Sequence, residues 1–102
     1  MDDTRRRDIC TKMIYESETA RDLGFQALHT ARDDHDLDRA KEMMEEASDH
    51  VLQAHLAQNE ILVAEAKGED VKVDVLMVHA HDHMSAALLA LDMIREKLED
   101  YR

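Results

Sequence analysis

Small and apolar residues recur at alternating steps of three and four along three long segments of this 102-residue chain. Such spacing places them on one face of an α-helix, because the helix repeats every 3.6 residues. Proline is absent, glycine occurs twice and only three residues are aromatic, which leaves few turns and little strand-forming material. We therefore predict an all-α fold. The clearest row consists of Leu37, Ala40, Met44, Ala47, Val51, Ala54, Gln58 and Ile61.

Two short breaks divide the chain. The residues from Asp33 to Asp36 are turn and capping types, and Gly68 is placed to end a helix in the left-handed conformation. Because the connections are short, neighbouring helices should run antiparallel, as an up-down-up three-helix bundle. The prediction is a single domain over residues 1–102, with helices at about 3–32, 37–67 and 70–101.

The first and third helices differ in their surfaces. The first has an inward row of mostly small residues, which lets another helix approach closely: Met13, Ser17, Ala20, Gly24, Ala27 and Ala31. The third is apolar nearly all round between Val73 and Ile94, and such a helix is stable only when buried on all sides. We therefore expect an oligomer with third helices packed near a symmetry axis. The alternative is a monomer whose many alanines make this surface only mildly apolar.

Charge and cysteine content limit the partners and the cellular compartment that we expect. Thirteen basic and 24 acidic residues give a net charge of −11, which argues against nucleic acid and anionic lipid as partners. The single cysteine, Cys10, cannot form an internal disulfide and fits a reducing cytoplasm. No uncharged apolar run of about twenty residues is present, and Met1 to Arg7 lacks an apolar signal core. We expect a cytoplasmic protein without membrane insertion.

Four ionisable residues, in the sequence His79-Ala80-His81-Asp82-His83, interrupt the apolar stretch of the third helix. Buried ionisable groups cost free energy unless they are paired, ligated or used. The candidates are a metal site, a nucleophilic histidine or a polar network at an oligomer interface. On a helix, His79, Asp82 and His83 should share one side and His81 should face another surface. Zinc needs three or four ligands, and neither an H-E-x-x-H motif nor a cysteine pair is present.

The segment Val75 to Met84, V-L-M-V-H-A-H-D-H-M, resembles the signature of a known family. This family comprises the lactose/cellobiose-type IIA components of the bacterial phosphoenolpyruvate-dependent sugar phosphotransferase system, whose pattern reads approximately L-M-V-H-A-Q-D-H-L-M. Glu46-Ala47 and the run Ala54 to Gln58 are similar to a second family motif, E-A followed by A-H-x-x-Q. The similarity covers nearly the whole chain and the order of its elements.

The resemblance implies a homotrimer of three-helix bundles that carries phosphoryl groups during sugar uptake. His79 would accept the group from the histidine-containing phosphocarrier protein and pass it to a cysteine of the cognate IIB component. His83 and Gln58 would support the reaction, and His55 would pack in a polar seam between helices. Asp82 would point to the three-fold axis, where three copies would surround one divalent metal ion, Mg²⁺, per trimer.

The chain departs from the family pattern at three positions. His81 replaces a glutamine beside the active histidine, which would make transfer pH-dependent or let His81 contact the phosphoryl group or a partner. His35 replaces a turn glycine and Glu18 a glycine of the first helix. We expect neither to touch the chemistry, although Glu18 would affect packing or docking. Two alternatives stay open: a non-catalytic regulatory module, and a metal-binding bundle that uses His79, Asp82 and His83. The sugar cannot be read from the sequence, since an IIA component does not touch it.

Overall fold

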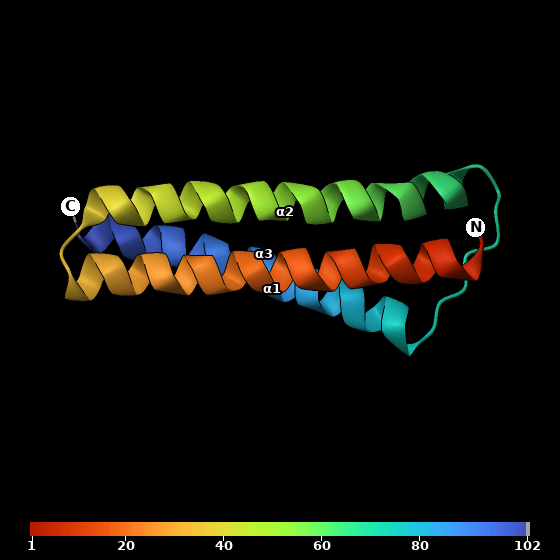
Figure 1. The fold of residues 1–102 in the computed structure, drawn as a ribbon, viewed down its shortest axis with the longest axis horizontal. Helices are drawn as coiled ribbons and strands as arrows, with labels where there is room; N and C mark the ends of the chain where they lie inside the picture. The colour runs from red at the N-terminus through yellow and green to blue at the C-terminus, as the bar shows by residue number, and fades with distance from the viewer. Residues whose placement is uncertain (102) are drawn as a thin grey trace.

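The computed structural model describes residues 1–101, and Figure 1 shows three long helices running up, down and up. They measure 50 × 21 × 18 Å together, and the described residues contain no strand. The all-α three-helix prediction is therefore confirmed. The elements are α1 (Asp3–Asp33), α2 (Leu37–Ala66), α3 (Val75–Leu98) and a 3-10 turn, η1 (Glu99–Tyr101).

Aspartates begin the first two helices. The side chain of Asp2 accepts the backbone N–H of Arg5 at 2.8 Å, and that of Asp36 accepts the N–H of Arg39 at 3.0 Å. Each satisfies one of the amide groups that the first turn of a helix leaves without a partner. The bounds of α1 and α2 accordingly lie within one residue of the predicted ones.

Gly68 ends α2 in the predicted way, with φ +85°. Its N–H donates to the carbonyl of Glu65 at 2.9 Å, and the N–H of Glu69 donates to the carbonyl of Ala64 at 3.1 Å. This pair of bonds is the Schellman motif, in which glycine adopts the left-handed conformation without steric cost.

His35 occupies the corresponding left-handed position after α1, with φ +54°. A side chain in this conformation costs roughly 1 kcal/mol relative to glycine. The glycine of the family pattern would relieve that strain, so the His35 substitution affects the turn.

The third helix begins at Val75, five residues later than the predicted start at Asp70. Asp74 caps it, accepting the N–H of Met77 at 3.1 Å and Nη1 of Arg6 at 2.8 Å. The Arg6 side chain is only 2% exposed and donates from Nη2 to Asp3 at 2.8 Å. The cap that α1 holds in place therefore sets the start of α3. The predicted end of this helix, at about residue 101, was also wrong. The α-helix ends at Leu98, and residues 99–101 form a 3-10 turn.

Acid is expected to destabilise the fold through Asp74. The N–H of Met77 and the Arg6 guanidinium hold the pKa of this carboxyl below its ordinary value. Its contribution to stability is thus complete above the ordinary pKa and is lost as pH falls through the folded value. In thermal unfolding, Tm should decline below about pH 4. The decline should be shallower for Asp74→Asn, which keeps a capping oxygen but does not titrate; parallel profiles would contradict this origin.

The inward row of α1 is buried at every predicted position, from Met13 to Ala31. At Gly24, an added Cβ would lie 2.5 Å from Cδ2 of Leu91 and 3.0 Å from Cδ1 of Ile94. Because real carbon atoms do not approach so closely, glycine is what allows α3 to pack tightly here. The predicted close approach of a second helix to α1 is therefore confirmed.

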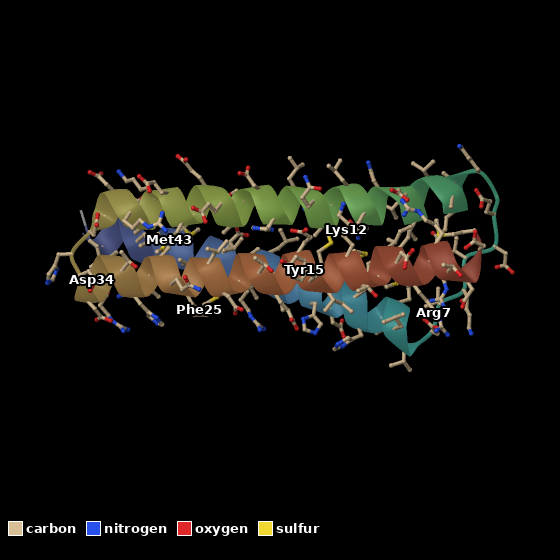
Figure 2. All side chains as sticks on the ribbon, in the orientation of Figure 1. Arg7, Lys12, Tyr15, Phe25, Asp34 and Met43 are labelled. Atoms are coloured by element: carbon tan, nitrogen blue, oxygen red, sulfur yellow. The ribbon has the colours of Figure 1, made fainter. Side chains whose placement is uncertain are left out.

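The outward face of α3 carries large apolar side chains that remain exposed on one chain. Val75, Val78, Leu89 and Met93 are all more than half exposed. Leu89 and Met93 also line a groove of about 700 Å³ with Phe25 of α1, which is labelled in Figure 2. The third helix is thus apolar beyond its buried side, as the sequence predicts.

Candidate active site

His79 and His83 lie one turn apart on α3 and contact each other. Their ring centroids are 4.3 Å apart with the planes at 83°, and the two Nε2 atoms are 3.1 Å apart, within hydrogen-bond distance. His79 is exposed, whereas the side chain of His83 is only 20% exposed. The imidazole of His79 is therefore accessible to another protein, and that of His83 contacts it from the more buried side.

Glu18 of α1 extends this pair. Its Oε1 atom lies 3.3 Å from Nδ1 of His83, the ring nitrogen that faces away from His79. The expectation that Glu18 lies apart from the candidate chemistry is therefore wrong. Nothing in the local sequence links residues so far apart along the chain; only the packing of α1 against α3 brings them together.

His81 and Asp82 both line a groove beside α2. Nδ1 of His81 lies 2.9 Å from the carbonyl of Met77, to which it donates. The groove has a volume of about 340 Å³ and lies between α3 and α2, and its lining on α2 includes Ile61 and Leu62. The separate orientation of His81 is as predicted.

Asp82 lies on the same side of α3 as His79 and His83, but no hydrogen bond or ion pair joins it to either ring within residues 1–101. Successive helical residues are about 100° apart, so Asp82 and His83 lie on opposite flanks of His79. Within residues 1–101, no three His, Cys, Asp or Glu side chains gather as possible metal ligands. The alternative of a metal-binding bundle that uses His79, Asp82 and His83 is therefore not favoured.

Neither candidate polar residue of α2 makes a hydrogen bond with the histidine pair within residues 1–101. Gln58 is half-buried, and no hydrogen bond joins it to His79 or His83 in the described part of the chain. His55 is exposed. The prediction that His55 packs in a polar seam is wrong, because its position on α2 falls outside the row that faces α1.

An exposed imidazole held by a second ring on a rigid helical bundle can act as a nucleophile. A solvent-accessible reactive atom suits a group carrier, which must present that atom to successive partner proteins. The fold and this site thus define a small helical carrier protein.

Comparison with known proteins gives the family. Residues 8–102 match the family model described as the lactose/cellobiose-specific IIA subunit of the phosphotransferase system. The lactose-specific EIIA component of Staphylococcus epidermidis is 37% identical over 83 residues, covering 81% of this chain and 79% of that protein. The N,N′-diacetylchitobiose-specific EIIA component of Escherichia coli is 33% identical over 92 residues, covering 90% and 78%.

Solved structures agree. The cellobiose-specific enzyme IIA from Bacillus anthracis superposes with a TM-score of 0.90 at 30% identity, covering 99% of this chain and 90% of that one. PtcA from S. mutans gives a TM-score of 0.92 at 30% identity, covering 99% and 98%. The chain belongs to the lactose/cellobiose-specific IIA family of the sugar phosphotransferase system.

As a member of this family, the protein is a phosphotransferase component that carries phosphoryl groups in sugar uptake. It works with a phosphocarrier protein and a IIB component. None of the helices in the described part of the chain is long and apolar enough to cross a membrane.

Proposed function

We propose that His79 is the residue that carries the phosphoryl group. The observation that carries this proposal is the exposed ring of His79, held by Nε2 of His83 at 3.1 Å. A lone pair on a ring nitrogen of His79 attacks the phosphorus of the phosphorylated phosphocarrier histidine. The donor N–P bond breaks, and its electron pair stays on the donor nitrogen. In the next step a cysteine thiolate of the IIB component attacks the same phosphorus, and the N–P bond to His79 breaks with its electron pair returning to the His79 ring nitrogen.

His83 supports this reaction by orienting the ring of His79. Positioning contributes much of the rate in phosphoryl transfer, and an exposed side chain without a neighbour samples several rotamers. Gln58 is retained as a second supporting residue on the resemblance to the family alone.

Three copies of the chain are proposed to assemble through α3. The exposed residues Val75, Val78, Leu89 and Met93 follow one outward face of this helix, and the apolar groove beside Phe25 continues it onto α1. An apolar surface of this extent is unfavourable in water and is covered when helices from other copies pack against it.

Asp82 is proposed to hold one divalent ion, Mg²⁺, per trimer. Its carboxylate is exposed beside Val78 on the apolar side of α3, and within residues 1–101 no basic side chain pairs with it. Three copies would bring three unpaired carboxylates together, and carboxylate oxygens are the ligands that hard cations prefer. The donor chemistry therefore fits the ion, which would neutralise the mutual repulsion of these groups.

The setting follows from the partners. The relatives are named for lactose, cellobiose and N,N′-diacetylchitobiose, all disaccharides, so uptake of a disaccharide is proposed. A cytoplasmic setting is proposed, which the buried free thiol of Cys10 supports.

Incubation with phosphoenolpyruvate, enzyme I and the phosphocarrier protein tests the function. The protein should gain one acid-labile, base-stable phosphoryl group per chain, and peptide mapping by mass spectrometry should locate it on His79. Adding a IIB component should then discharge it. Absence of labelling, or labelling of another residue, would overturn the assignment.

A further inference from the structure

We propose that Glu18 is a positioning residue for phosphoryl transfer, acting through His83 on His79; the proposal rests on the function proposed above. The three side chains form a continuous chain of contacts. Glu18 Oε1 lies 3.3 Å from His83 Nδ1, and His83 Nε2 lies 3.1 Å from His79 Nε2. Glu18 comes from α1 and both histidines from α3, so the packing of these two helices sets the geometry.

The first contact fixes the orientation of the His83 ring. Oε1 of Glu18 lies at ion-pair distance from Nδ1, and a carboxylate attracts a ring nitrogen that carries a proton and repels the lone pair of one that does not. Rotating the ring by half a turn would put carbon atoms where Nδ1 and Nε2 now lie. Both contacts would then be lost, and a buried part of His83 would be left without a polar partner. Glu18 thereby favours the ring orientation that directs Nε2 at His79.

The second contact transmits this orientation to the exposed ring. The ring of His79 is exposed to solvent, and within residues 1–101 its polar partner is Nε2 of His83. Holding one edge of the ring limits rotation about the bonds of the side chain, so that the ring presents a constant direction to a docking partner. Loss of alignment between reacting atoms lowers the rate even when every reacting group is present.

Glu18 is suited to this role because it contacts His83 and yet is not buried in the core. Its side chain is 46% exposed, so it can be replaced without opening a cavity in the core. The family pattern leads to the expectation of glycine at this position, which has no side chain to supply the contact. The chain therefore contains an orienting contact that its family pattern does not specify.

Histidine ring NMR and transfer kinetics together test the role of Glu18. The Glu18→Ala protein should show changed ring-nitrogen signals for both His83 and His79, because the carboxylate facing Nδ1 of His83 is gone. Its initial rate of phosphoryl uptake from the phosphocarrier protein should fall about tenfold. Glu18→Gln should retain part of the rate, since its amide oxygen keeps a partial negative charge near Nδ1 but not the full charge of the carboxylate.

Glu16 provides a matched control on the same helix. Its carboxylate also faces a histidine Nδ1, that of His50 of α2, with which it makes a hydrogen bond. Glu16→Ala should leave uptake unchanged. Unchanged His83 signals in Glu18→Ala, an unchanged uptake rate, or an equal loss in Glu16→Ala would each overturn the role of Glu18. Failure of the wild-type protein to accept phosphate would instead overturn the proposed function, while the ring signals would still report on the Glu18 contact.

Discussion

Replacing His79 with alanine is expected to abolish phosphate uptake while the three-helix fold stays intact. The substitution removes the exposed imidazole that would attack phosphorus, and alanine has no nucleophile to replace it. The fold should be unaffected because His79 lies on the solvent side of α3, where alanine improves helix propensity by about half a kcal/mol. Labelling with radioactive phosphoenolpyruvate, enzyme I and the phosphocarrier protein measures the loss, and circular dichroism checks the fold.

His55→Ala is the matched control for this experiment. It removes another exposed imidazole from the same bundle, on α2 rather than α3. Uptake by this variant should equal that of the wild-type protein. Retained labelling in His79→Ala would move the carrier site to His81 or His83. Mapping the labelled peptide would then distinguish these two residues. His83 is the half-buried partner of His79, and His81 lies at the groove beside α2.

The helical rows could be predicted because they depend on local spacing and on the volume of single residues. The row from Met13 to Ala31 has the period of a helix, and its small side chains leave room for a neighbour. Gly68 follows the same logic, since few residues other than glycine accept its backbone conformation. Such features are encoded within a few turns of chain.

The start of α3 could not be predicted in this way, because two aspartates compete to cap it. Asp70 and Asp74 are both suitable capping residues, and local preference does not separate them. Arg6, 68 residues earlier, decides the outcome by donating to Asp74 from a buried position. The residue that fixes this boundary is recognisable only after α1 and α3 have packed.

The candidate site shows the same division. The resemblance selected His79 and His83, and their spacing of four residues predicts the contact that the structure shows. The contribution of Glu18 was missed, because its contact with His83 depends on the rotation of α1 relative to α3. The family pattern does not predict this contact, since its glycine at that position carries no functional group.

Replacing Asp82 with leucine is expected to remove the metal ion and to make trimer formation independent of metal. Unit charges 4 Å apart repel by about 1 kcal/mol even in water, so three converging carboxylates oppose assembly unless a cation lies between them. Leucine removes this repulsion and extends the exposed apolar face that includes Val78 and Leu89. Elemental analysis should find about one divalent ion per three wild-type chains and none in the variant.

Sedimentation with and without a chelator completes the test. Chelation should weaken the wild-type trimer and leave the Asp82→Leu trimer unchanged, while both proteins still accept phosphate because, within residues 1–101, Asp82 makes no hydrogen bond or ion pair with His79 or His83. Asp49→Leu, which adds the same side chain at an exposed site on α2, should behave as the wild-type protein does. A wild-type trimer that contains no metal and resists the chelator would contradict the axial role of Asp82. Loss of phosphate uptake in Asp82→Leu would show instead that the α2-facing side of α3 takes part in transfer.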